Sequence, residues 1–250
     1  VEEVALVDEP TAAAMGAGLP AGSKLLVIDI GGCTIDLSLV ALEGGEGKAA
    51  PVAQLMRFDG QDLDQKSTQV LRTAKVLGKA GQRLGGRDFD KWIANYLYPQ
   101  KNLSESLLNA SEKLKCRLSD ENISAADVLE EIVEESTSTN LLKLRLCRVE
   151  LEQLLIERGL LKIMDKLLKL IFRYGSANNC TLEDLKGVVV VGGGARVPLI
   201  RKWIKQNINP APLLTPPPIE AVAKGALSLT PGVKIRDVLH RGASLRCWDK

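Results

Sequence analysis

The sequence has 250 residues, of which 45% are hydrophobic and 26% are charged, as is typical of a soluble globular protein with a sizeable core. Lys and Arg total 33 against 31 Asp and Glu, and only 4% of residues are aromatic, so neither charge nor base stacking favours nucleic acid or an anionic membrane as a partner. No apolar run approaches the ~20 residues that span a bilayer. Five scattered cysteines and one histidine without a CxxC pair predict reduced thiols, no zinc site and a cytoplasmic protein.

The chain begins with a predicted short helix and a predicted β-hairpin. Residues 9–18 favour a helix because Pro10 falls in the first turn, where its missing N–H costs nothing. Residues 25–30 form an apolar run typical of a buried strand, and the alternation over 35–42 predicts a second strand. The residues between the two strands, GGCT (31–34), form the tip of the hairpin.

The middle of the chain predicts a loop followed by alternating helices and strands. Residues 43–68 are first polar and glycine-rich and then mixed, which indicates a long loop or insertion. The elements predicted after it are a strand near 70–79, a helix over 84–97 that starts at or near Asp88, a helix over 103–118, a surface helix and turn over 120–140, a strand over 141–147 and one long helix over roughly 149–174.

The last predicted unit is an apolar strand that ends in three glycines and continues as a helix, over residues 187–208. A proline-rich connection leads from residue 212 into a final helix of small residues that ends near 229. We assign no fold to the tail from Pro231.

Two glycine clusters, Gly31–Gly32 and Gly192–Gly194, directly follow buried strands. Glycine lets backbone N–H groups approach an anion closely, so both clusters are candidate phosphate sites. For either cluster taken alone, a tight turn that needs φ > 0 and holds no ligand is the favoured explanation. Neither is a Walker loop, because no Gly-Lys-Ser/Thr follows, and neither has GxGxxG spacing.

Oxygen-bearing side chains surround the first glycine cluster. Asp29 precedes the glycines, and Thr34 and Asp36 follow them. Hydrated Mg²⁺ prefers oxygen ligands, and a hydroxyl can donate to a phosphate or orient a water molecule. For Asp36 alone, a solvated turn residue is the alternative explanation.

Six segments of the sequence match known motifs, in order DEPTAAAMGAGL (8–19), LLVIDIGGCTIDLSLV (25–40), LGGRDFDKWIANYL (84–97), ASEKLKCRLS (110–119), VVVVGGGARVPLIR (188–201) and IEAVAKGALSL (219–229). They resemble successive motifs of the Hsp70 chaperone family of the actin-like ATPase superfamily. The glycine hairpin is common to the whole superfamily, whereas EPTAAA and LGGxDFD are particular to Hsp70. The resemblance implies an α/β fold: an RNase H-like lobe with a mixed sheet and flanking helices over 1–85 and 175–230, a smaller inserted α+β subdomain over 86–174 and a linker-like tail over 231–250.

The resemblance also implies a site for ATP or ADP with Mg²⁺. Residues implied to act at the phosphates are Gly31, Gly32 and Thr34, with Asp29 and Asp36 positioning Mg²⁺-bound and attacking water and Glu9 joining that water network. Residues implied to hold the adenosine are Gly192, Gly193, Gly194 and Arg196 on one side and Glu112, Lys115 and Ser119 on the other.

Several positions depart from the family pattern. Cys33 replaces the third glycine of the family's hairpin, and Cys116 replaces the arginine that stacks on adenine in the family. Arg87 replaces the acidic residue of the family motif LGGEDFD, and Ile219 replaces the aspartate that precedes EAVA in the family. Residues 43–68 also exceed the family's short turn by about twenty residues. These departures predict weakened adenine binding.

The family resemblance implies a chaperone whose ATP hydrolysis gates the binding of unfolded polypeptide. Its partners would be the first lobe of the ATPase domain, a J-domain co-chaperone, a nucleotide exchange factor and unfolded polypeptide. The family's first phosphate loop and catalytic lysine lie in that first lobe, so we expect this chain alone not to hydrolyse ATP. Two alternatives are another actin-like ATPase or sugar kinase, which EPTAAA and LGGRDFD disfavour, and a non-catalytic nucleotide-sensing or scaffold protein.

Overall fold

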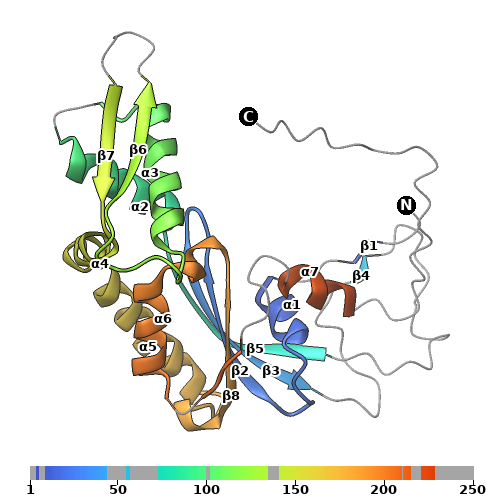
Figure 1. Cartoon of the computed structure of the whole chain (residues 1–250). Coiled ribbons are helices and arrows are strands. Elements are labelled where there is room, and N and C mark those ends of the chain that lie inside the picture. The colour runs from blue at the N-terminus through green and yellow to red at the C-terminus, as the bar shows by residue number, and fades with distance from the viewer. Residues whose placement is uncertain are drawn as a thin grey trace, which may run out of the picture.

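A mixed five-stranded sheet is the centre of the molecule (Figure 1). The structure, a computed structural model, describes residues 4–5, 9–43, 55–56, 73–99, 102–134, 141–209, 211–214 and 221–228. The strands follow the order β5 (Thr73–Gln82), β3 (Ile35–Glu43), β2 (Lys24–Ile30), β8 (Leu185–Val191) and β9 (Leu213–Leu214). β2 pairs antiparallel with β3 and parallel with β8, so the expected α/β class with a mixed sheet is confirmed.

Helices cover both faces of this sheet. Successive residues of β2 point to opposite faces. Leu25 and Val27 pack toward α1 (Glu9–Gly16), and Leu26, Ile28 and Ile30 belong to the larger cluster that includes α5 (Leu160–Ser176) and α6 (Pro198–Asn207). α7 (Ala221–Ser228) lies against α1 on the first face (Figure 1), where a Cβ on Gly225 would collide with the backbone of Ala12.

A second group of elements extends from one end of the sheet (Figure 1). It consists of α2 (Gly86–Leu97), α3 (Glu105–Leu118), the antiparallel pair β6 (Leu129–Glu134) and β7 (Leu141–Leu146), and α4 (Arg148–Glu157). Its buried residues, such as Leu114 and Leu144, belong to the same hydrophobic cluster as the sheet residues Ile28 and Leu37. The core is therefore continuous between the sheet and this second group.

The structure corrects two predicted elements. Residues 129–134 form the strand β6 instead of a surface helix, because Val133 is buried and the segment pairs with β7 along its whole length. The long helix expected over 149–174 is two helices, because Gly159 between them adopts φ 84°, a left-handed conformation that ends α4.

Most of the remaining elements agree with the predictions, and a few short strands were not predicted. The helix and hairpin at the start of the chain, the strands β5, β7 and β8 and the helices α2, α3, α6 and α7 are confirmed, with shifts of a few residues at their ends. The sequence did not predict β9 or the short pair β1 (Val4–Ala5) and β4 (Leu55–Met56). Apart from Glu43 and β4, the segment 43–68 lies outside the described residues, as do Ile219 and the tail from 231. In the described part of the chain no helix has the length and apolar character needed to cross a membrane.

Candidate functional site

The tip of the β2–β3 hairpin is a tight turn closed by the backbone. The N–H of Gly31 donates to the carbonyl of Thr34 at 3.0 Å. Gly32, Cys33 and Thr34 are exposed at the tip, and Gly31 is half-buried. The turn therefore presents backbone and a hydroxyl to solvent at the end of two otherwise buried strands.

The first turn of α2 is fastened to this tip. The N–H groups of Gly86 and Arg87 donate to the carbonyls of Gly31 and Gly32 at 2.9 and 2.8 Å. A Cβ on Gly85 would lie 2.5 Å from the amide nitrogen of Cys33 and 2.7 Å from the carbonyl oxygen of Gly31, so only glycine permits this approach. The two glycines of LGGRDFD thus serve to bring α2 against the hairpin.

The second glycine turn follows β8 and leads through the 3₁₀ turn η3 (Gly193–Arg196) into α6. Gly192 adopts φ 82°, and a Cβ there would lie 2.7 Å from a carboxylate oxygen of Asp29. A Cβ on Gly194 would collide with the side chain of Ile30. Gly193 faces open space, so this turn rests on the end of β2 with one glycine uncovered.

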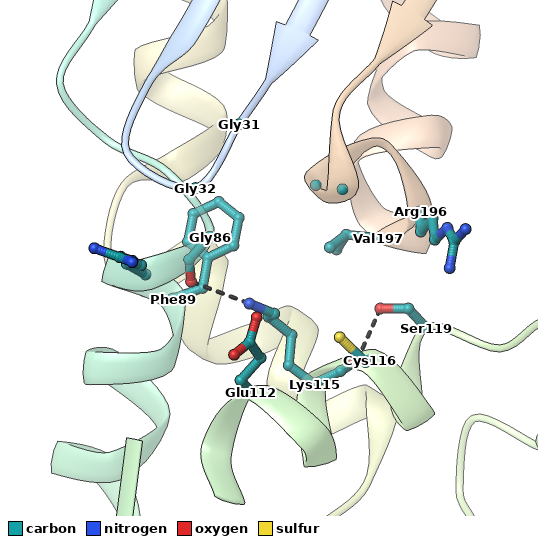
Figure 2. A pocket seen from close by; sticks show the side chains of 13 residues that line it. Gly31, Gly32, Gly86, Phe89, Glu112, Lys115, Cys116, Ser119, Arg196 and Val197 are labelled. Atoms are coloured by element: carbon teal, nitrogen blue, oxygen red, sulfur yellow. Dashed lines mark hydrogen bonds between the residues drawn. The ribbon is translucent and has the colours of Figure 1, made fainter. Parts of the chain in front are cut away.

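A cavity of about 280 Å³ opens between the two glycine turns and α3 (Figure 2). This volume is near the lower end of the ~300–1,000 Å³ that small-molecule sites occupy. The residues that line it are Gly31, Gly32, Gly86, Arg87, Phe89, Glu112, Lys115, Cys116, Ser119, Gly193, Gly194, Arg196 and Val197.

Lys115 joins α3 to α2 at the edge of this cavity (Figure 2). Its Nζ lies 2.7 Å from a carboxylate oxygen of Asp90 and donates to the carbonyl of Gly86 at 3.1 Å. Both members of the ion pair are buried, and burial raises the pKa of Asp90 while the Lys115 charge opposes that rise. Lys115 therefore holds α3 against α2, and two of the N–H donors of its ammonium group are already used.

The other α3 residues at the cavity keep free functional groups. Glu112 and Cys116 are exposed, and Ser119, which is half-buried, donates its hydroxyl proton to the carbonyl of Lys115 at 2.9 Å and keeps its acceptor capacity. Burial raises the pKa of the Cys116 thiol, so this side chain is neutral at physiological pH. Arg117 turns away from the cavity to pair with Glu131 of β6 at 2.5 Å.

Three carboxylates gather on the other side of the hairpin, on the sheet face that α1 covers. Asp29 and Asp36 are directly opposite each other in the β2–β3 register, and Glu9 begins α1. Burial, then the negative charges of Glu9 and Asp36, raise the pKa of Asp29 from 3.8 to about 6. Among the described residues no three acidic, histidine or cysteine side chains converge closely enough to ligate one metal ion directly.

An arginine from α6 links the two walls of the cavity. Arg201 donates through Nε to the carbonyl of Ala195 at 3.1 Å and pairs through Nη1 with Glu121 at 2.5 Å. Glu121 lies in the loop after α3, and Arg148 at the start of α4 holds the same loop through the carbonyls of Leu118, Asp120 and Ile123. These contacts fix the end of α3 relative to the second glycine turn.

The structure places most of the residues singled out in the sequence in two groups. Those that line the cavity are Gly31, Gly32, Glu112, Lys115, Ser119, Gly193, Gly194 and Arg196. Glu9, Asp29 and Asp36 form the carboxylate group, Thr34 lies at the hairpin tip, and Gly192 contacts Asp29. Sequence reasoning missed the lining residues Gly86, Phe89 and Val197 and gave Arg87 no role at the site. The signal that could have found Gly86 is the glycine pair Gly85–Gly86 at the start of α2.

The family model and the individual relatives that match this chain point to the same family of proteins. The family model described as Hsp70 protein matches residues 1–238. The chain is 28% identical over 228 residues to the chaperone protein HscA homolog of Colwellia psychrerythraea (strain 34H / ATCC BAA-681), an alignment that covers 90% of this chain and 32% of that protein. It is 30% identical over 227 residues to the HscA homolog of Ralstonia pickettii (strain 12J), covering 88% of this chain and 31% of that protein.

A similarity of the same kind extends to the chaperone protein DnaK of Nitrosopumilus maritimus (strain SCM1). The two sequences are 26% identical over 255 residues, which is 95% of this chain and 35% of that protein. The chain thus spans about a third of the length of the curated relatives it matches.

Proposed function

This chain belongs to the Hsp70 family, and we propose that it forms one nucleotide-binding lobe of an Hsp70-like chaperone ATPase. Members of this family bind ATP or ADP with Mg²⁺. The observation that carries the proposal is the cavity enclosed by two glycine turns and α3. A glycine-lined cavity with exposed arginines suits a ligand that carries phosphate groups.

The hairpin end of the cavity is proposed to hold the β- and γ-phosphates. Gly31 and Gly32 have no Cβ to keep a phosphate away, and the exposed Thr34 hydroxyl can donate to an anionic oxygen. Gly193 at the facing turn, where a Cβ would meet nothing within 4 Å, leaves room for the rest of the nucleotide.

The α3 end is proposed to hold the adenosine. Arg196, Gly193 and Gly194 approach from one wall, and Glu112 and Ser119 from the other. Glu112 supplies an acceptor for ribose hydroxyls, and Ser119 keeps an acceptor oxygen. Lys115, which the sequence placed among the direct contacts, acts mainly by positioning α3.

The carboxylates Glu9, Asp29 and Asp36 are proposed to face Mg²⁺ through water and to orient the attacking water. The raised pKa of Asp29 fits this role, because a group crowded by two like charges is stabilised in its ionised form by a nearby cation. Bound Mg²⁺ would neutralise charge on the phosphates. The carboxylates of this chain would accept hydrogen bonds from the attacking water and hold it in line with the phosphate bond that breaks.

The chain is also proposed to divide as Hsp70 ATPase lobes do, with 1–85 and 175–230 as the RNase H-like part and 86–174 as an inserted smaller subdomain. The distinct grouping of α2, α3, α4 and β6–β7 supports this division, although the hydrophobic core is continuous across it. The unpaired thiols of Cys33, Cys116, Cys147 and Cys180 support a reducing, cytoplasmic location.

The proposed partners are those of a chaperone: the facing lobe of the ATPase domain, a J-domain co-chaperone, a nucleotide exchange factor and unfolded polypeptide. Hydrolysis requires phosphates held from two sides. Because this chain spans about a third of its relatives, we propose that the 250 residues alone bind nucleotide without hydrolysing it.

Calorimetric titration of the full-length protein with Mg·ADP tests the proposal. Gly193→Val places a side chain in the cavity at a position where a Cβ meets nothing within 4 Å and φ is not positive. We expect the wild type to bind Mg·ADP and this variant to lose at least tenfold in affinity, with an unchanged melting temperature. Equal binding by the two proteins would place the nucleotide elsewhere and overturn the proposal.

A non-catalytic nucleotide sensor is the second candidate function. The neutral Cys116 at the adenosine end favours it, because it provides neither charge nor a planar surface for stacking. The two functions are distinguished by steady-state ATP hydrolysis in the full-length protein, with Asp29→Ala as the matched control. Hydrolysis that depends on Asp29 identifies the ATPase, and binding without hydrolysis identifies the sensor.

A further inference from the structure

Arg87 is an exposed cation at the hairpin end of the cavity. It is the second residue of α2 and lines the cavity beside Gly31 and Gly32. Its N–H donates to the carbonyl of Gly32 at 2.8 Å, which fixes its backbone against the hairpin tip. The guanidinium makes no hydrogen bond or ion pair with another described residue, and its positive charge opposes the rise in the pKa of the nearby Asp90 without a direct contact.

The backbone at the start of α2 cannot bind an anion in place of this side chain. A helix N-terminus usually offers free N–H groups to an anion. Here the N–H groups of Gly86 and Arg87 are used by the hairpin carbonyls, and those of Asp88 and Phe89 donate to the carbonyl of Gly85. Any attraction for phosphate at this end of α2 has to come from a side chain.

The acids near Arg87 are already engaged with other groups. Asp88 accepts from the N–H of Gly85 at 3.0 Å and from Lys91 at 3.5 Å. Asp90 pairs with Lys115 at 2.7 Å, which also neutralises the lysine. Arg87 therefore keeps its positive charge available, whereas the positive charge of Lys115 is balanced by Asp90.

The charges that line the cavity favour an anionic ligand. Glu112 is the one acid among the described lining residues, and because Asp90 balances the charge of Lys115, the lining cations without an ion-pair partner are Arg87 and Arg196. Arg87 lies at the wall formed by α2 and the hairpin, and Arg196 at the wall formed by η3. A ligand with negative charge beside the hairpin tip is favoured by this distribution.

We propose that Arg87 binds a terminal phosphate of the nucleotide and so distinguishes nucleoside di- and triphosphates from the nucleoside. A planar guanidinium can hold two phosphate oxygens at once, which an ammonium group cannot. This inference rests on the proposed nucleotide site. It adds the side chain of Arg87, on α2, to the groups that bind the phosphates there.

The test compares ADP with adenosine, because adenosine occupies the cavity without a phosphate. Mg·ADP and adenosine are titrated separately into the full-length wild type and into Arg87→Glu, Arg87→Lys and Arg173→Glu. Arg173 is an exposed arginine in the last turn of α5 outside the cavity lining, so its variant makes the same charge change away from the cavity.

We expect Arg87→Glu to lower the affinity for Mg·ADP by about tenfold or more and to leave the adenosine affinity within about twofold. Arg87→Lys should retain part of the ADP affinity, and Arg173→Glu should change neither ligand. Melting curves of the four proteins verify that each is folded.

Wild-type affinity for Mg·ADP in Arg87→Glu, or an equal loss for ADP and adenosine, would overturn the role of Arg87 while leaving the nucleotide site in place. A wild type that binds neither ligand would overturn the nucleotide site itself, and this inference with it. An equal loss of ADP affinity in Arg173→Glu would show a general electrostatic effect and would also overturn the specific role.

Discussion

The two ends of the cavity are built in different ways. At the hairpin end, backbone meets backbone: Gly85 packs on the turn of Gly31 and Gly32, and α2 donates its first N–H groups to that turn. At the α3 end, side chains make the contacts, with Lys115 bound to Asp90 and with Cys116 and Glu112 facing the cavity. A backbone-built end depends on glycine and tolerates little change, whereas a side-chain-built end can be altered one residue at a time. Of this chain's departures from the Hsp70 pattern, Cys116 lies at the side-chain-built end, whereas Cys33 and Arg87 lie at the hairpin end, where their side chains are exposed.

Lys115→Met tests the side-chain end and has the largest expected effect. It leaves the buried carboxylate of Asp90 without its counter-charge, so we expect a loss of about 3–4 kcal/mol in the free energy of unfolding at pH 7. Since burial raises the pKa of Asp90, the loss should shrink as the pH falls and the carboxylate takes up a proton. Urea denaturation at several pH values measures both effects.

The double variant Lys115→Met/Asp90→Asn provides the control for this prediction. It removes both charges, and most of the lost stability should return. If the single variant is as stable as the wild type, the ion pair does not hold α3 against α2.

Gly85→Ala tests the backbone end. The added Cβ would lie 2.5 Å from the amide nitrogen of Cys33, and neither backbone can move without disturbing the hairpin. We expect a loss of about 2–3 kcal/mol in the free energy of unfolding. Gly32→Ala is the matched control, because a Cβ there meets nothing within 4 Å, and its stability should change by about 0.5 kcal/mol at most. Equal effects of the two substitutions would contradict the close packing of α2 on the hairpin.

Cys116→Arg sharpens the contrast at the adenosine end. An arginine restores a planar cation where this chain has a neutral thiol, and stacking on adenine is worth about 0.5–2 kcal/mol. We expect tighter Mg·ADP binding in the full-length protein, by about tenfold in calorimetry. Cys147→Ala, at a buried cysteine outside the cavity lining, should leave the affinity unchanged. Unchanged or weaker binding by Cys116→Arg would show that adenine does not lie against α3 at this position.

Asp29→Asn has the smallest expected effect and the clearest pH dependence. Because the pKa of Asp29 is raised from 3.8 to about 6, the folded protein binds an extra proton between these pH values, and its stability falls as the pH rises through that window. Without Mg²⁺, the asparagine variant should therefore be more stable than the wild type at pH 8. We expect a gain of about 1 kcal/mol after allowing for solvent screening of this partly exposed group, and no gain below about pH 4.

The measurement for Asp29→Asn is thermal unfolding from pH 3.5 to 8. Asp184→Asn serves as a control, since hydrogen bonds from Thr181 lower the pKa of that carboxyl and its variant should show the opposite trend. A pH-independent difference between Asp29→Asn and the wild type would count against the crowding of Glu9, Asp29 and Asp36.

The contrast between the two ends also explains what the sequence could predict. The glycine turns were found because glycine after an apolar strand has a local meaning that needs no tertiary contact. The commitment of Lys115 to Asp90 was not found, because it depends on how α2 and α3 pack. Arg87 was recognised only as a departure from a motif, since its place at the cavity follows from the docking of α2 on the hairpin.

The two wrong elements have different explanations. Half of the residues of 129–134 are glutamates, which suggested a surface segment, and the pairing with β7 makes it a strand. Gly159 was passed over within a strongly periodic helical pattern, although a single glycine at φ 84° was enough to divide it.

Hydrogen–deuterium exchange of the full-length protein with and without Mg·ADP tests the central claim most directly. Nucleotide in the cavity should slow exchange in both glycine turns and in the facing α2 and α3 segments, at residues 31–34, 84–90, 112–119 and 192–197. Helix α5, outside the cavity lining, provides the internal reference and should exchange equally in both states. Protection confined to other segments, or none at a saturating nucleotide concentration, would contradict the account.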